Sequence, residues 1–473
     1  MDPEHATTVQ EYPHGIGGFA ERLDRLRWSR IHTRIAIALG IAWILDGFET
    51  TIVGPILGLL AGQLHFDLHA AAWINPIYTI GMLAGALIFG PLADALGRKR
   101  LFLVTLALYA GATVLTGFAW DFRSLALFRF LTGIGIGGEY AAINSAVDEF
   151  VPARYRGRAD GLINASWNVG VIVASSLAIV AFTGDLGERW RWVFWAGALT
   201  AVAVMLVRVI VPESPRWLAA RGKTAQAEIV VRAIEARARV HPNGHAGDRN
   251  GASETADAAP PRRFHAQVAE LLRAYPQRTI FSWVVNLAQV SPYYGLVAIA
   301  GIALFPALGV PPHDVPLLYL AGAIGGLGGQ ILTALGVDAW GRRPVMLVAF
   351  AAAGLLALVL GHVHTLPLFV AVFVAFSAAS GATGSGAYVL ISELFPTELR
   401  ASGIGLSVAV GRIGAIISPI AFYALFSHAG AGAVYAGMAS IFAVGAAAMM
   451  WWLRFGVEGR GRSLEAMLET GVR

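Results

Sequence analysis

Twelve apolar runs divide this chain, and each is about as long as a helix that crosses a lipid bilayer. Such a helix needs about 20 apolar residues. The first six runs lie near residues 32–60, 70–93, 101–119, 124–147, 160–182 and 190–211. The other six lie near residues 278–308, 315–337, 344–362, 366–391, 402–427 and 431–453. The pattern predicts an all-α membrane protein with twelve transmembrane helices.

The composition supports a membrane protein and excludes some kinds of chemistry. Charged residues make up 14% of the chain, and the mean hydropathy is +0.62, whereas soluble globular proteins carry about 25% charged residues. The chain has no cysteine, which excludes disulfides and Cys-containing metal sites. Its net charge of +5 comes mainly from arginines in short loops between apolar runs. We therefore expect contact with a lipid bilayer and none with nucleic acid.

The two halves of the chain carry the same short motifs. Residues 90–100 read GPLADALGRKR, and residues 336–343 read GVDAWGRR. Seven positions recur 244 residues later: Asp94, Gly97, Arg98, Glu149, Pro152, Arg156 and Gly161 correspond to Asp338, Gly341, Arg342, Glu393, Pro396, Arg400 and Gly405. A parallel duplication in so apolar a chain is typical of a transporter whose site lies between its halves.

The distribution of basic residues predicts the orientation. The loops after helices 2, 4, 8 and 10 carry nine basic residues, and the loops after the odd-numbered helices carry three. Because cytoplasmic loops are enriched in arginine and lysine, both termini are expected in the cytoplasm.

The same pattern divides the chain into five segments. These are a cytoplasmic N-terminal segment (1–30), a six-helix bundle (31–211), a central cytoplasmic loop (212–276), a second bundle (277–455) and a cytoplasmic tail (456–473). In the loop, residues 212–240 are expected to be helical, and residues 241–263 are expected to be disordered. Phe19, Leu23 and Leu26 are spaced for one face of a helix at the membrane surface.

Several segments resemble the major facilitator superfamily. GPLADALGRKR resembles the family's signature after helix 2, and GVDAWGRRP resembles its second copy. PESPRWL (212–218) resembles the sugar-porter signature, while ELFPTELRASGIG (393–405) and RFLTGIGIGGEY (129–140) are also similar to family segments. RLDRLRWSRIHTR (22–34), leading into WILDGFE (43–49), resembles bacterial metabolite–proton symporters of the aromatic-acid and niacin type. The resemblance implies two pseudo-symmetric six-helix bundles, a central cavity and alternating access.

Two acidic residues near the middle of the first helix are candidates for proton coupling. Asp46 and Glu49 are three residues apart and share a helix face with Trp43. A charged residue at the bilayer centre costs about 2.5–3.5 kcal/mol on insertion scales, so it is expected to face a watery cavity or a partner. Glu139 in helix 4 is a third candidate. The alternative is that these acids form fixed ion pairs.

Arg412, near the middle of helix 11, is the candidate for binding a substrate carboxylate. It is the only basic residue deep in the apolar runs of the second half, and a guanidinium presents a planar fork that matches a carboxylate. Organic-anion members of the superfamily carry arginine in this helix, which strengthens the prediction. The alternative is a structural pair with Asp46, Glu49 or Glu139.

Other polar and aromatic residues in the helices suit a small, partly planar ligand. Residues of these types also form interhelical hydrogen bonds without touching a ligand. The candidates are Trp43, Tyr78, Tyr140, Asn144, Trp167, Asn168, Asn286, Gln289, Tyr293, Tyr294 and Tyr388.

The repeated motifs place charged residues at the expected cytoplasmic helix ends. Their carboxylates and guanidinium groups are expected to clamp the two bundles together as a cytoplasmic gate; the alternative is a signal for folding or orientation. The residues are Asp94, Arg98, Glu149, Arg156, Asp338, Arg342, Glu393 and Arg400.

These observations predict a secondary active transporter that carries a small organic carboxylate, aromatic or nicotinate-like, together with protons. PESPRWL favours the alternative of a sugar or polyol–proton symporter, and a membrane substrate sensor on the same fold is an alternative from another class. No nucleophile–base set, Walker motif or metal constellation is visible, so we expect no enzyme activity, cofactor or metal. We expect a monomer in a bacterial inner membrane.

Overall fold

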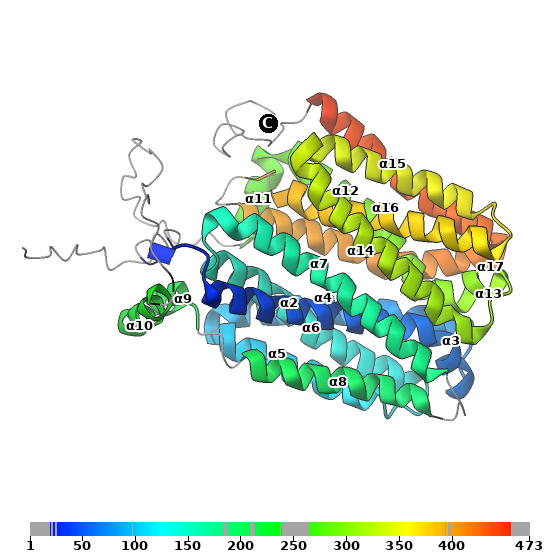
Figure 1. Ribbon diagram of the computed structural model, residues 1–473, viewed down its shortest axis with the longest axis horizontal. Coiled ribbons are helices and arrows are strands. Elements are labelled where there is room, and N and C mark those ends of the chain that lie inside the picture. The colour runs from blue at the N-terminus through cyan, green and yellow to red at the C-terminus, as the bar shows by residue number, and fades with distance from the viewer. Residues whose placement is uncertain are drawn as a thin grey trace, which may run out of the picture.

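The computed structural model describes residues 19, 22–23, 26–96, 98–182, 188–208, 213–236, 238, 264–392, 394–395 and 399–455. Long helices running in roughly the same direction make up most of this part of the chain (Figure 1). Each of the twelve predicted membrane spans coincides with helical structure. Among the described residues, eight helices are long and apolar enough to cross a membrane by length and composition.

The first half begins with a span that is interrupted after its midpoint. Its two parts meet at Ile52, three residues before Pro55. Proline has no backbone N–H, so Pro55 cannot donate the helical hydrogen bond to the carbonyl of Thr51. The helices of this half are α2 (Arg30–Thr51), α3 (Val53–Gln63), α4 (Leu68–Leu96), α5 (Arg98–Thr116), α6 (Phe122–Phe150), α7 (Ala153–Ala181) and α8 (Arg189–Arg208).

The second half repeats this arrangement. Its first span also changes geometry, from α-helix to a short π-helical turn. Its last two spans are joined at Gly430, whose φ of 77° favours glycine. The elements are α12 (Pro276–Ile299), η1 (Ala300–Leu304), α13 (Phe305–Ala307), η2 (Pro312–Asp314), α14 (Val315–Trp340), α15 (Arg342–Leu360), α16 (Leu366–Ser392) and α17 (Arg400–Phe455).

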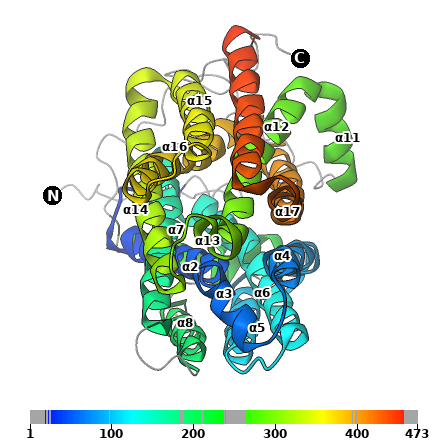
Figure 2. The ribbon, with the colours of Figure 1, turned by 90° about the vertical axis from the view of Figure 1, so that its right-hand side faces the viewer.

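The helices form two bundles that meet through equivalent elements. In the first half α2 packs on α7 and α4 packs on α6; in the second, α12 packs on α17 and α14 packs on α16. The bundles contact each other mainly through α7 with α14 and through α4 with α17. Figure 2 shows the blue-to-cyan helices below the yellow-to-red ones. Because α4 and α14 carry the duplicated motif, these two contacts are related by the internal repeat.

Three helices of the central connection lie at one end of the bundles: α9 (Pro215–Ala220), α10 (Thr224–Glu235) and α11 (Phe264–Ala274) (Figure 1). The first two lie within residues 212–240, the part of the loop that was expected to be helical, whereas residues 241–263 lie outside the described residues. In the N-terminal segment, the expectation of a membrane-facing stripe is wrong. Phe19, Leu23 and Leu26 are each only 2% exposed and belong to one apolar cluster with α9 and α10. The apolar stripe is covered by another amphipathic helix of the same chain rather than by lipid.

An ion-pair network fixes the N-terminal segment to α10. Arg22 contacts Glu228 at 2.6 Å and Glu235 at 2.7 Å, in both cases through two hydrogen bonds. Hydrogen bonds from Arg22, and then from Arg232, lower the pKa of Glu228 to about 2. Glu228 therefore stays ionised at physiological pH, and the paired segment and helix form one unit.

At the opposite end, the bundles approach so closely that only glycine fits. A Cβ added to Gly54 of α3 would lie 2.7 Å from the carbonyl oxygen of Val297, and one added to Gly301 of η1 would lie 2.8 Å from that of Gly54. Tyr319 supports η1, because its hydroxyl donates to the Val297 carbonyl at 2.7 Å and accepts from the Gly301 N–H at 3.2 Å. These contacts close this end of the space between the bundles.

Substituting Gly54 with alanine is therefore expected to separate the bundles at this end, because the added methyl group meets backbone that cannot rotate away. The chain has no natural cysteine, so spin labels on Gly62→Cys and Ala307→Cys would report the distance without background. The matched control is Gly111→Ala, whose added Cβ meets nothing within 4 Å. A distance distribution unchanged by Gly54→Ala would show that this contact does not hold the end closed.

Candidate functional site

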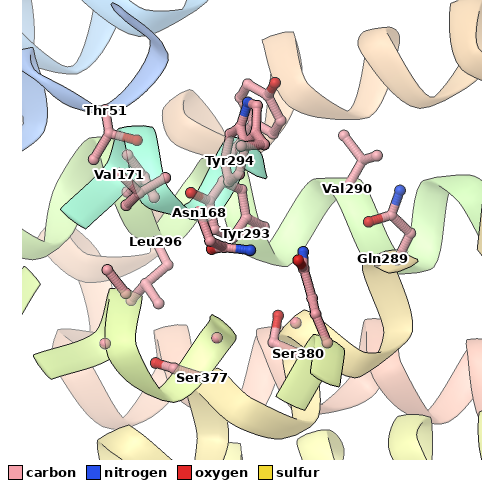
Figure 3. A pocket seen from close by; sticks show the side chains of 18 of the residues that line it. Thr51, Asn168, Val171, Gln289, Val290, Tyr293, Tyr294, Leu296, Ser377 and Ser380 are labelled. Carbon is pink, nitrogen blue, oxygen red and sulfur yellow. The ribbon is translucent and has the colours of Figure 1, made fainter. Parts of the chain in front are cut away.

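A cavity of about 190 Å³ lies between the two bundles, where the duplicated halves face each other. The first half contributes residues of α2 and α7, and the second half contributes residues of α12, α14, α16 and α17. Figure 3 shows a close view of this lining. Its composition is mixed: aromatic rings and small glycines stand beside amides, hydroxyls and two groups of opposite charge. The cavity therefore suits a small ligand with an apolar body and polar ends.

Asp46 is the acidic group of this cavity. Its side chain is buried and its Oδ2 accepts a hydrogen bond from Trp167 Nε1 at 3.1 Å. Among the described residues, Oδ1 has no hydrogen-bond partner. A buried carboxylate with an open acceptor site can take up a proton or bind a donor on a ligand.

Glu49 lies one turn further along α2, but it is held inside the first bundle. Arg129 of α6 donates to Glu49 Oε2 at 2.9 Å and to its backbone carbonyl at 2.6 Å, and Thr113 donates to Oε1 at 2.8 Å. Both charged side chains are almost fully buried. Breaking such a pair by removing one partner typically costs about 3–5 kcal/mol. Of the two alternatives given for the acids, the ion pair therefore fits the surroundings of Glu49.

Tyr78 completes this buried network instead of lining the cavity. The guanidinium of Arg129 lies 4.4 Å from the centre of the Tyr78 ring, and the Tyr78 hydroxyl is 3.2 Å from Thr50 Oγ1. The sequence analysis placed Tyr78 among the candidate ligand-binding residues as an aromatic group on a helix face. In the structure, the guanidinium of Arg129 packs over the Tyr78 ring.

Arg412 is the cationic group of the cavity. Its Nη1 lies 3.4 Å from the Tyr294 hydroxyl and 2.9 Å from Met82 Sδ of α4, so the side chain of α17 reaches the opposite bundle. Asp46 of the first half lines the same cavity. A guanidinium and a carboxylate from different halves therefore share one small, largely apolar space, where their attraction is stronger than in water.

Aromatic side chains form a wall beside these charges. Trp167 and Tyr293 meet edge to face with their centroids 5.5 Å apart, and Tyr293 and Tyr294 do so at 5.6 Å. Trp167 comes from α7 and the two tyrosines from α12, so the wall joins both halves. Such rings provide a flat apolar surface for a planar ligand.

Nine of the predicted ligand-binding residues line the cavity: Trp43, Trp167, Asn168, Asn286, Gln289, Tyr293, Tyr294, Tyr388 and Arg412. The side chains of Tyr140, Asn144 and Glu139 lie outside the described residues. The same holds for seven of the gate residues, Asp94, Arg98, Glu149, Arg156, Asp338, Glu393 and Arg400. Arg342 is described as a half-buried residue at the start of α15. The gate therefore stays a prediction.

Sequence reasoning missed polar residues of α14 and α16. Gln330 of α14 lines the cavity together with Ser377, Ser380 and Ser385 of α16. The serines follow a spacing of three to five residues that ends at Tyr388, which places them near one helix face. This spacing was the signal available in the sequence. The described residues include no group of three or more His, Cys, Asp or Glu side chains that could hold a metal ion.

Comparisons with known proteins agree with this architecture. A family model described as "Sugar (and other) transporter" matches residues 36–470. The chain is 30% identical over 403 residues to the inner membrane metabolite transport protein YgcS of Escherichia coli (strain K12), covering 84% of this chain and 85% of that protein. It is 28% identical over 450 residues to the niacin transporter NiaP of Acinetobacter baylyi, covering 94% and 98%.

A solved structure shows the same fold. The proton:xylose symporter XylE of the major facilitator superfamily, bound to 6-bromo-6-deoxy-D-glucose, superposes with a TM-score of 0.68 at 19% sequence identity. The alignment covers 92% of this chain and 98% of that structure.

Proposed function

We propose that this chain, which belongs to the family of sugar and other transporters and has the fold of a major facilitator symporter, carries a small organic carboxylate together with protons. The observation that supports this proposal most is Arg412, a guanidinium at the wall of an otherwise largely apolar cavity. It offers a planar fork of donors that matches a carboxylate. The aromatic wall of Trp167 and Tyr293 suits an aromatic or nicotinate-like body.

The distribution of charge in the cavity suggests how a proton and an anion could be coupled. Asp46 and the carboxylate of a substrate would compete for the charge of Arg412. Two carboxylates in a small, low-dielectric space repel each other, so a proton on Asp46 favours binding of the anion. Loss of the proton and loss of the substrate would then favour each other on the other side of the membrane.

Glu49 is a second candidate carrier of the proton. A proton on Glu49 would neutralise one half of the buried pair with Arg129 and weaken the link between α2 and α6. The proposal therefore keeps two candidate carriers in different surroundings: Asp46 in the cavity and Glu49 inside the first bundle. Glu139 remains a third candidate from the sequence.

A sugar or polyol is the second candidate substrate. The amides of Asn286 and Gln289, which are 3.4 Å apart, and the serines of α16 favour it, because neutral polyhydroxy ligands need many hydrogen-bonding groups. The relative named as a niacin transporter supports the carboxylate, since niacin is a carboxylic acid on a pyridine ring. A substrate sensor is the alternative that does not involve transport.

For the molecule in the cell, we propose a monomer in a bacterial inner membrane with both termini in the cytoplasm. The nine-to-three distribution of basic loop residues supports this orientation. The helices α9, α10 and α11 then lie on the cytoplasmic side. The charged residues of the repeated motifs would form the gate at that side, and Gly54 and Gly301 would close the periplasmic side.

Uptake into proteoliposomes tests the proposed function. With an inward proton gradient, we expect accumulation of benzoate or nicotinate, little uptake of hexuronates and none of hexoses, and a protonophore should abolish accumulation. Liposomes without protein measure passive entry of the protonated acids. Accumulation of hexoses alone would favour the sugar symporter, and binding of ligands without any uptake would favour the sensor.

A further inference from the structure

Two amide side chains of the cavity have buried polar atoms that bond to nothing in the described residues. Asn168 of α7 is 5% exposed and its Nδ2 has no hydrogen-bond partner. Gln330 of α14 is half-buried, and its Oε1 is buried without a partner. Both residues line the cavity. A buried polar atom without a partner costs free energy, so both amides offer a ligand in the cavity a hydrogen-bonding group that is not already used within the described residues.

The two amides lie at one place, where the bundles meet. The position of a Cβ on Gly326 is 3.4 Å from Asn168 Oδ1, so Asn168 crosses from α7 to the surface of α14. Gln330 follows Gly326 by four residues on the same helix, and residues at this spacing share a face about 5–6 Å apart. The amides therefore reach the same stretch of α14 from different halves of the molecule.

Serines of α16 extend this polar region. In Figure 3 the side chain of Asn168 lies beside Tyr293, facing the side of the cavity where Ser377 and Ser380 lie. Arg412 and Tyr294 belong to α17 and α12, which are different walls. The cavity thus has one charged polar region at Arg412 and one neutral polar region at Asn168 and Gln330.

We propose that Asn168 and Gln330 form a hydroxyl-binding subsite, so that the preferred substrate carries a hydroxyl group in addition to its carboxylate. This inference rests on the proposed function, which assigns the carboxylate to Arg412. A hydroxyl is the simplest group that both donates and accepts, so one oxygen can accept from an amide N–H and donate to an amide carbonyl. A ring nitrogen could satisfy only the donor, and a methyl group neither.

The subsite predicts a specific selectivity among ligands. A site built to bond a hydroxyl rejects an analogue that lacks it more strongly than an apolar pocket rejects an added group, because the analogue leaves buried polar atoms without partners. We expect the protein to bind a hydroxybenzoate about tenfold more tightly than the methylbenzoate of the same substitution pattern. The methyl group matches the hydroxyl in size, so the comparison isolates the hydrogen bonds.

The test is calorimetric titration of the full-length protein in lipid nanodiscs with benzoate, 3- and 4-hydroxybenzoate and 3- and 4-methylbenzoate. Asn168→Leu and Gln330→Met keep the approximate size of each side chain and remove its hydrogen bonds. Each is expected to reduce the preference for hydroxyl over methyl to about twofold or less. The control is Ser176→Ala, which removes a hydroxyl on the exposed face of the same helix α7.

The outcomes separate this inference from the function on which it rests. Equal affinities for hydroxy- and methylbenzoates in the unmodified protein would overturn the subsite, and water would then be the hydrogen-bond partner of the amides. Binding of benzoate itself would still support the carboxylate site. A hydroxyl preference that survives in both variants would place recognition elsewhere. If no aromatic carboxylate binds at all, the proposed function fails, and the subsite fails with it. The unmodified protein alone gives the first and third results, so a variant that does not fold leaves the test intact.

Discussion

Replacement of Arg412 by alanine is expected to weaken carboxylate binding tens-fold or more. Arg412 is the cation of the cavity, and removing one partner of a desolvated charge pair typically costs about 2–5 kcal/mol. Arg412→Lys is expected to restore little of this loss, because an ammonium is a point charge that does not reproduce the planar two-point geometry of a guanidinium. Calorimetric titration with benzoate or nicotinate measures both effects.

The neutral amide of the same acid provides the control for Arg412. It should bind the unmodified protein weakly and lose little in Arg412→Ala, since it has no charge to be neutralised. Tyr294→Phe is a second control, because it removes only the hydroxyl that lies 3.4 Å from Arg412. If Arg412→Ala binds charged and neutral ligands as the unmodified protein does, Arg412 serves as a structural partner of an acid such as Asp46. The sugar symporter would then become the better proposal.

Asp46→Asn is expected to abolish accumulation driven by a proton gradient while exchange of substrate across the membrane continues. Asparagine keeps the size of the side chain and can still accept the hydrogen bond from Trp167, but it cannot take up and release a proton. Uptake and counterflow in the same proteoliposomes measure the two activities. Normal accumulation in this variant would exclude Asp46 as the carrier.

Glu49→Gln is expected to affect stability as well as transport, because it also leaves Arg129 buried without its countercharge. We expect a lower free energy of unfolding, by about 3–5 kcal/mol, in addition to any effect on coupling. Thermal unfolding of the variant therefore accompanies the transport assay. A stable Glu49→Gln protein that exchanges but does not accumulate would assign the proton to Glu49, whereas normal accumulation would leave the ion pair a structural role.

The fold could be predicted from the sequence because lipid restricts the possibilities so strongly. Apolar runs of fixed length define the spans, and the 244-residue repeat defines the two bundles. The contacts of α7 with α14 and of α4 with α17 join equivalent helices of the two halves, as the repeat in the sequence predicts. Arg412 and Asp46 could be placed in the cavity because a charge inside the membrane needs an aqueous or charged environment.

The partners of individual side chains could not be predicted in the same way. Helical spacing indicates which residues share a face, but it does not indicate which helix covers that face. Glu49 and Arg129 are 80 residues apart, and their pairing depends on how α2 crosses α6. The same limit affected Tyr78, whose ring packs on Arg129. It also affected Phe19, Leu23 and Leu26, for which two different apolar partners would have fitted equally well.

The pairing of Arg22 with Glu228 has a consequence for the order of events during synthesis. These residues are 206 positions apart, and ribosomes add about 5–20 residues per second. The N-terminal segment therefore waits roughly 10–40 s, while six membrane spans are made, before α10 emerges to cover Phe19, Leu23 and Leu26. During this interval its apolar residues are available to the membrane surface or to chaperones, and the arrival of α10 marks the completion of the first bundle.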